Sequence, residues 1–160
     1  KSIADNTGME LTILRLSNPF GIHQLTSHSA GLIGAILRNV KNNKVTTLHY
    51  NGQQIRDYFN VDLLSDIVLK ISSCYGKSPR LLNISSGIGL SANQVCHIIS
   101  TYLKTDIAIA KQIESHDQIN RSVLDPSKAQ RWMGIKCYDH NIESWLNRVG
   151  FKKTYRCLIK

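Results

Sequence analysis

The sequence predicts an α/β fold, in which short strands alternate with amphipathic helices. Runs of apolar and β-branched residues, for example at 11–16 and 45–50, have the length and composition of strands. Apolar residues at helical spacing lie between such runs, most clearly at 31–42. Pro, Gly and helix-capping residues separate the segments. With 160 residues, the chain is long enough to bury a core.

The expected elements can be placed in chain order. Strands are predicted at 9–18, 45–50, 80–85 and 106–113, and helices at 31–42, 61–76, 91–104, 125–134 and 141–151. The first strand is a near-continuous apolar run that ends at Asn18, before Pro19. Such a run is typical of a strand that is buried on both faces.

Helix ends are marked by capping residues. Asp62 is the expected N-cap of the helix at 61–76, and Asp125 that of the helix at 125–134, which should stop at Gly134. Ser91 and Gln94 form the Ser-x-x-Gln pattern of a capping box, so a helix should begin at Ser91.

Composition limits the possible functions. The 20 Lys and Arg residues exceed the 11 Asp and Glu residues, for a net charge of +9, which favours partners that carry phosphate or other negative charge. The four cysteines have no Cys-x-x-Cys spacing and the histidines do not cluster with acids, so neither a zinc site nor a disulfide framework is expected. No apolar run is long enough for a membrane span. We therefore expect a cytoplasmic protein with reduced thiols and without a bound metal.

Four stretches resemble one known family. In order they read ILRLSNPFG (13–21), GQQIRDYFNVDLLSDIVLKI (52–71), LLNISSGIGLS (81–91) and SVLDPSKAQRWMG (122–134). They are similar to blocks in the carboxy-terminal half of the extended short-chain dehydrogenase/reductases, the NAD-dependent nucleotide-sugar epimerases and dehydratases typified by UDP-galactose 4-epimerase. The blocks stand in the family's order and approximate spacing, and the resemblance runs from about residue 10 to residue 135.

The resemblance implies a division of the Rossmann-type fold. Residues 1–18 would end the cofactor-binding domain and residues 19–160 would form the substrate-binding domain, with the strand at 81–86 as a candidate to return to the cofactor sheet. The family's catalytic Tyr-x-x-x-Lys is absent, because no Tyr in this sequence is followed four residues later by Lys. The chain is therefore expected to be a carboxy-terminal fragment that is inactive alone and whose NAD is bound mainly by an amino-terminal half.

Arg56 and Asn18 are the first expected substrate contacts. The resemblance places a phosphate-binding arginine at Arg56, whose planar guanidinium can grip two phosphate oxygens. The alternative is a surface ion pair with Asp57 or Asp62. Asn18 ends a strand, where ligands bind in open α/β sheets, although Asn-Pro also suits a simple turn. The family comparison places the neighbours Ser17 and Pro19 at the nicotinamide end of the cofactor.

Further contacts are implied along the nucleotide. Gly31 and Leu32 match a helix start that approaches the diphosphate, where unpaired N–H groups favour an anion. A short family strand that lies under the nucleobase matches Leu48, His49 and Tyr50. His49 or Tyr50 would stack on the base. Packing at a sheet edge is the alternative role for these two rings.

The last implied contact is an aspartate that holds the ribose. Asp117 is the candidate, but Glu114 stands three residues before it, where the family has an arginine. His116 or Arg121 is a possible substitute for that second phosphate contact.

One glycine-rich stretch imitates a cofactor loop. Residues 87–92 read Gly-x-Gly-x-x-Ala between a predicted strand and a predicted helix, as in a dinucleotide fingerprint. The next strand does not end in the acidic residue that such a loop needs for the ribose. We therefore expect a structural turn that does not bind NAD.

Together these observations predict the substrate-binding half of an NAD-dependent nucleotide-sugar epimerase or dehydratase. The expected substrate is a UDP-sugar, the expected pathway is cell-surface polysaccharide biosynthesis, and the full-length protein should be a homodimer. A nucleotide-sugar reductase of the same superfamily and a stand-alone basic module that binds RNA or other anions are the alternatives.

Overall fold

The fold is described from a computed structural model, for residues 2–25, 31–74, 77–113, 119–134 and 141–151. Its helices are α1 Ser2–Thr7, α2 Leu32–Lys41, α3 Asp62–Ser73, α4 Ala92–Leu103, α5 Ser127–Met133 and α6 Ile142–Arg148, with short 3-10 helices at Ile22–Leu25 and Tyr50–Gly52. Its strands are β1 Ile13–Leu16, β2 Asn18–Phe20, β3 Thr46–His49, β4 Ile55–Asn60, β5 Leu81–Ile84, β6 Gly89–Ser91, β7 Ile109–Gln112 and β8 Arg121–Ser122. The α/β prediction is confirmed.

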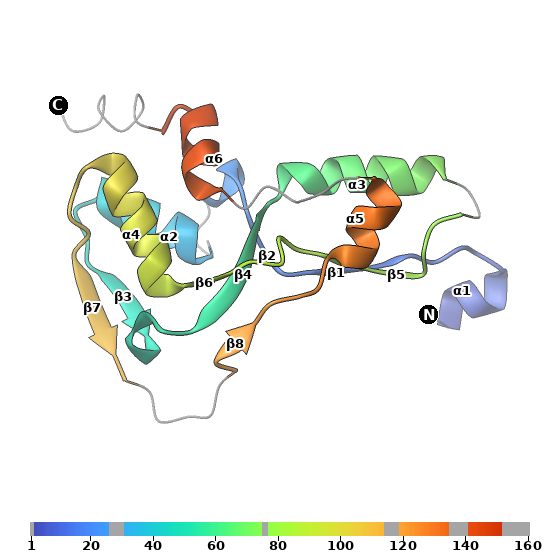
Figure 1. Cartoon of the computed structure of the whole chain (residues 1–160), viewed down its shortest axis with the longest axis horizontal. Helices are drawn as coiled ribbons and strands as arrows, with labels where there is room; N and C mark the ends of the chain where they lie inside the picture. The colour runs from blue at the N-terminus through green and yellow to red at the C-terminus, as the bar shows by residue number, and fades with distance from the viewer. Residues whose placement is uncertain (1, 26–30, 75–76, 114–118, 135–140, 152–160) are drawn as a thin grey trace.

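Strand β4 is the centre of the strand arrangement (Figure 1). It pairs in parallel with β2, where Asn18 faces Tyr58, and antiparallel with β6, where Ile55 faces Ser91. Strand β8 pairs with β4 in parallel. Two further parallel pairs, β1 with β5 and β3 with β7, complete the pairing of the described strands.

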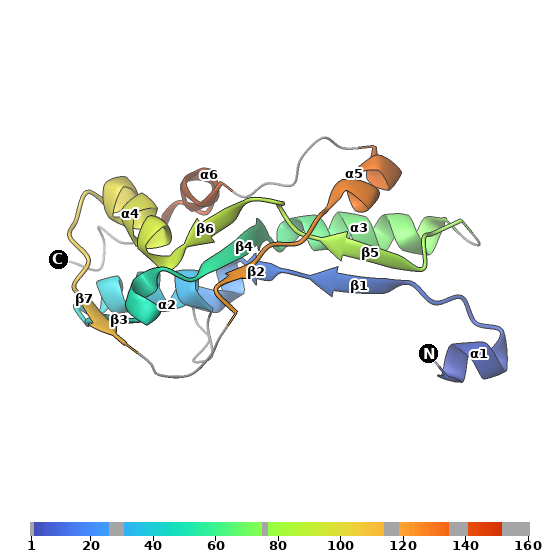
Figure 2. The same cartoon turned by 60° about the horizontal axis from the view of Figure 1, so that its bottom comes forward.

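Two hydrophobic cores lie on either side of β4. The first gathers buried residues of β2, α2, α4 and α6, including Phe20, Ile36, Leu37, Ile99 and Trp145. The second joins β4, α3, β5 and α5 through Phe59, Ile67, Leu82, Ile84 and Ala129. Tyr58 belongs to the first core and Phe59 to the second, because successive strand side chains point to opposite faces. Figure 2 shows α3 and α5 beside β1 and β5, and α2, α4 and α6 at the other end of the molecule.

Strand β1 corrects one prediction. It begins at Ile13 and is not buried on both faces: Ile13 is 44% exposed and Leu16 is 41% exposed, and only Leu14 packs against the second core. The physical reason is that β1 pairs only with β5 among the described strands, so nothing in this part of the chain completes a parallel sheet around it.

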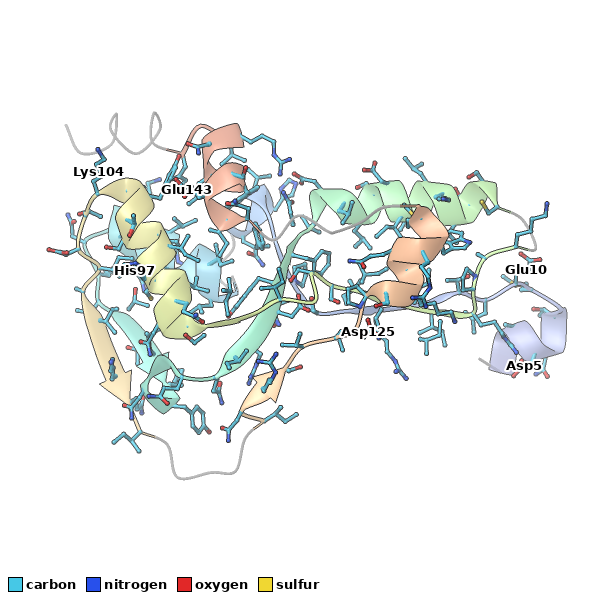
Figure 3. The ribbon with its side chains drawn as sticks, in the orientation of Figure 1. Asp5, Glu10, His97, Lys104, Asp125 and Glu143 are labelled. Carbon is cyan, nitrogen blue, oxygen red and sulfur yellow. The ribbon has the colours of Figure 1, made fainter. Side chains whose placement is uncertain are left out.

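Two of the four predicted helix ends, Ser91 and Gly134, are confirmed. Ser91 Oγ accepts a hydrogen bond from Gln94 N at 3.1 Å, and Gln94 Oε1 accepts one from Ser91 N at 2.8 Å, which makes the capping box. At α5 the N-cap is Pro126 and not the predicted Asp125. Asp125, labelled at the beginning of α5 in Figure 3, accepts bonds from Ser127 Oγ at 2.5 Å and from Ser127 N at 2.9 Å. These bonds from Ser127 lower the pKa of the Asp125 carboxyl. Gly134 ends α5 with a φ of 74°.

Strand β4 and its link to α3 were not predicted correctly. Its six residues mix charged, aromatic and amide side chains, so they show no apolar alternation, yet both Asp57 and Asn60 are buried. Asp62 is not the N-cap but the first residue of α3: the N-cap is Val61, and Asn60 Oδ1 accepts a bond from Asp62 N at 3.0 Å. No helix among the described residues has the length and apolar content to cross a bilayer.

Candidate functional site

A cavity of about 390 Å³ opens where β2, the start of α2, β3 and β4 meet. It is lined by Asn18, Pro19, Phe20, Gln24, Gly31, Leu32, Ile33, Thr47, Leu48, His49, Gln54, Arg56, Tyr58 and Ala92. Among the residues that the structure describes, this lining contains one permanent cation, Arg56, and no carboxylate. Seven of the site residues predicted from the sequence line this cavity: Asn18, Pro19, Gly31, Leu32, Leu48, His49 and Arg56.

Arg56 lies on β4, and two hydrogen bonds hold its guanidinium in place. Its Nη1 donates to Ile55 O at 2.9 Å, and its Nη2 donates to Gln54 Oε1 at 3.2 Å. A guanidinium has five N–H donors, so these two bonds leave donors for a ligand. The alternative ion pairs do not form, because Asp62 pairs with Arg148 at 3.6 Å and Asp57 is buried on the other side of the strand.

Asn18 is fixed at the edge of the cavity by the neighbouring strand. Its Nδ2 donates to the backbone O of Asp57 at 3.0 Å. Pro19 also lines the cavity, and its carbonyl accepts a bond from Gln24 Nε2 at 2.9 Å. Ser17 does not line the cavity; its Oγ donates to Asp57 Oδ1 at 3.2 Å. The strand end therefore presents Asn18 and Pro19, and turns Ser17 inward.

Helix α2 begins at the cavity. Gly31 is its N-cap in an extended conformation and, as a glycine, has no side chain to cap the first turn. The first N–H groups of a helix have no partner within the helix and favour an anion. Gly31 and Leu32 stand in the same cavity lining as Arg56, so both groups suited to a phosphate face one space.

Strand β3 supplies the apolar wall of the cavity. Leu48 is 1% exposed, and His49 lines the cavity beside it. Tyr50 is not among the lining residues. It begins a left-handed turn in which Tyr50 has a φ of 50° and Asn51 one of 54°, and Asn93 Nδ2 holds the turn through a 2.8 Å bond to Asn51 O.

The predicted ribose contact cannot be placed. Asp117 lies outside the described residues, together with Glu114 and His116. Arg121 is described on β8, where it stands opposite Ile55 of β4.

The beginning of the glycine-rich stretch binds a carboxylate of the protein itself. Ser86 N donates to Asp57 Oδ1 at 2.9 Å, and Gly87 N donates to Asp57 Oδ2 at 3.0 Å. An alanine Cβ at Gly89 would lie 2.5 Å from Ile55 Cγ2, so this glycine permits the close pairing of β6 with β4. The backbone N–H groups of Ser86 and Gly87 thus bind Asp57. That the stretch does not bind NAD stays a prediction.

Seven lining residues were not predicted: Phe20, Gln24, Ile33, Thr47, Gln54, Tyr58 and Ala92. One pattern could have found two of them. Gln54 and Tyr58 stand two residues from Arg56, as expected for neighbours on one face of a strand, but β4 was not recognised. Burial raises the pKa of Tyr58 to about 12, so this phenol stays protonated near neutral pH. Gln24 carries no sequence signal of its own.

Comparison with known proteins places the chain in a family. Residues 1–85 match the model of the NAD dependent epimerase/dehydratase family. The dTDP-L-rhamnose 4-epimerase of Burkholderia thailandensis is 29% identical over 97 residues, which are 60% of this chain and 27% of that protein.

Two solved structures share the fold. UDP-N-acetylglucosamine 4-epimerase from Methanobrevibacter ruminantium, in complex with UDP-N-acetylmuramic acid, superposes with a TM-score of 0.77 at 24% identity, over 99% of this chain and 49% of that one. UDP-glucose 4-epimerase from Thermotoga maritima, with UDP-glucose, gives 0.79 at 22% identity, over 96% and 49%. The chain spans about half the length of these structures. By its sequence match, it belongs to the NAD-dependent epimerase/dehydratase family.

Proposed function

We propose that this chain is the substrate-binding half of an NAD-dependent nucleotide-sugar epimerase or dehydratase, and that its cavity binds the nucleoside diphosphate of a UDP-sugar. The observation that carries the proposal is the convergence of Arg56 and the start of α2 on one cavity, whose lining among the described residues has no carboxylate. A cation and a helix start on one cavity favour a phosphate group.

The remaining lining fits the rest of a nucleotide. Leu48 and Ile33 offer apolar surface, and His49 offers a ring for stacking on a base. Asn18 and Gln54 carry amide groups suited to hydroxyls. The chain's role in the reaction would be to hold the nucleotide so that the sugar lies in reach of the reacting groups.

The division of the chain between two domains is part of the same proposal. Residues 1–18 would belong to the cofactor-binding domain, residues 19–160 to the substrate-binding domain, and the strand at 81–86 would return to the cofactor sheet. Two observations support it: β5 pairs with β1, and these strands share the second core with α3 while the cavity residues border the first.

The family's NAD would then be held mainly by residues outside this chain, with Ser17 and Pro19 near the nicotinamide. We further propose a cytoplasmic homodimer that acts in cell-surface polysaccharide biosynthesis. The 160 residues alone should show no turnover with NAD, since they contain no Tyr-x-x-x-Lys.

Titration calorimetry with UDP tests the binding proposal. Arg56→Ala should weaken UDP binding by about 10- to 100-fold, the range for loss of charge-assisted hydrogen bonds. Arg80→Ala is the matched control, because Arg80 is exposed and pairs with Asp5 at 3.7 Å, away from the cavity. It should leave UDP affinity unchanged.

Titration with single-stranded RNA distinguishes the proposed function from the alternative, a basic RNA-binding module. RNA binding that falls steeply with salt and ignores Arg56→Ala, without saturable UDP binding, would replace the proposal with a basic RNA-binding module.

A further inference from the structure

Asp57 is a fully buried carboxylate beside the cavity that the proposed function does not use. Its exposed fraction is 0%. A buried charge is costly unless hydrogen bonds replace its lost water. Here Oδ1 accepts bonds from Ser86 Oγ at 2.7 Å, Ser86 N at 2.9 Å and Ser17 Oγ at 3.2 Å, and Oδ2 accepts one from Gly87 N at 3.0 Å.

These bonds join three segments that are far apart in the sequence. Ser17 lies between β1 and β2, Asp57 lies on β4, and Ser86 and Gly87 follow β5. The backbone of Asp57 adds a fourth connection, since its carbonyl accepts the 3.0 Å bond from Asn18 Nδ2. One residue therefore holds the strand end that carries Asn18 against the strand that carries Arg56.

The geometry of β4 links this network to the cavity. Arg56 and Tyr58 both line the cavity, whereas the carboxylate of Asp57 between them points to the loop at 85–87 on the opposite side. A shift of β4 relative to β2 would move Arg56 relative to Asn18. Without the carboxylate, these two cavity groups would lose the link through Ser17, Ser86 and Gly87 and would keep the strand pairing and the bond from Asn18 Nδ2 to the Asp57 carbonyl.

We propose that Asp57 is a positioning residue for nucleotide binding, which sets the placement of Arg56 and Asn18 through its bonds to Ser17, Ser86 and Gly87. The inference rests on the proposed function, because it assigns Asp57 a role in the same cavity. Asn is the informative replacement: it keeps the shape, but its NH₂ group would face an N–H or O–H donor.

A thermodynamic cycle in the full-length protein tests the proposal. UDP affinity is measured by calorimetry for the wild type, Asp57→Asn, Arg56→Ala and the double variant, and unfolding in urea is followed for each. Asp57→Asn should weaken UDP binding by about tenfold or more when Arg56 is present, and by about threefold or less in the Arg56→Ala background, where only the placement of Asn18 is still lost. A merely structural role would give the same loss in both backgrounds.

Ser17→Ala is the milder variant in case Asp57→Asn does not fold. It removes only the 3.2 Å bond, and should weaken UDP binding about two- to threefold when Arg56 is present, and by less in the Arg56→Ala background. Unchanged affinity in folded Asp57→Asn or, if that variant does not fold, in Ser17→Ala would overturn the inference and leave the proposed function standing. Absence of UDP binding by the wild type would overturn the proposed function itself.

Discussion

Replacement of Gly87 by Ala tests the structural interpretation of the glycine-rich stretch. Gly87 has a φ of 78°, and a Cβ built there would lie 3.1 Å from both Cδ and Cγ of Pro126. The left-handed conformation costs an L-residue about 1–2 kcal/mol. Crowding against the proline ring adds about 1 kcal/mol, the lower end of the range for overpacking. We therefore expect Gly87→Ala to lower the free energy of unfolding by about 2–3 kcal/mol.

Gly134→Ala is the matched control for the conformational part. Gly134 has a φ of 74°, and nothing lies within 4 Å of a Cβ built there. This variant should lose only the conformational contribution of about 1–2 kcal/mol. Urea unfolding followed by circular dichroism measures both, provided that the slope of each transition is unchanged.

The same variant separates the two interpretations of the loop. Under conditions in which it is folded, Gly87→Ala in the full-length protein should bind NAD as the wild type does, because the Gly87 N–H bonds to Asp57. Unchanged stability together with weakened NAD binding would refute the reasoning and restore the cofactor-loop interpretation.

Two further predictions concern the capping box and the buried tyrosine. Ser91→Ala should lower the free energy of unfolding by about 1 kcal/mol in urea, because the N-cap bond to Gln94 N is lost, and an unchanged midpoint would contradict the capping role. The pKa of Tyr58 is raised to about 12 by burial, so the folded state holds this proton more tightly than the unfolded state does. The resulting stability is present below pH 10 and is lost as pH rises from about 10 to about 12. In urea titrations over this pH range, Tyr58→Phe should lose less free energy of unfolding than the wild type. An equal loss in the two proteins would contradict the prediction.

Local signals predicted the helices and two of their four expected ends. The Ser91–Gln94 capping box and the helix end at Gly134 each depend on a few adjacent residues, so they can be predicted from the sequence alone. Asp62 illustrates the limit of such signals. It suits an N-cap by residue type, but α3 already begins at Asp62, and Asn60 at the end of β4 accepts the bond from Asp62 N.

Non-local interactions account for what was missed. Strand β4 has no apolar alternation because its buried Asp57 is satisfied by donors that lie 29 to 40 residues away. Such partners cannot be predicted from periodicity. The exposure of β1 also depends on distant segments. An apolar run indicates a preference for burial but does not show which segments cover it.

The cavity could be predicted only in part. The motif resemblance implied Arg56, Asn18 and the start of α2, which do face one cavity, whereas Tyr50 turns into a left-handed bend outside its lining. Gln54 and Tyr58 required knowledge that 55–60 is a strand.

The central claim is that Arg56 holds a nucleoside diphosphate in this cavity, and calorimetric titration of UDP into the wild type, Arg56→Ala and Arg80→Ala tests it most directly. The account predicts saturable binding by the wild type and Arg80→Ala, and a loss of about 10- to 100-fold in Arg56→Ala. Equal affinity in all three proteins, or no saturable binding by the wild type, would contradict it.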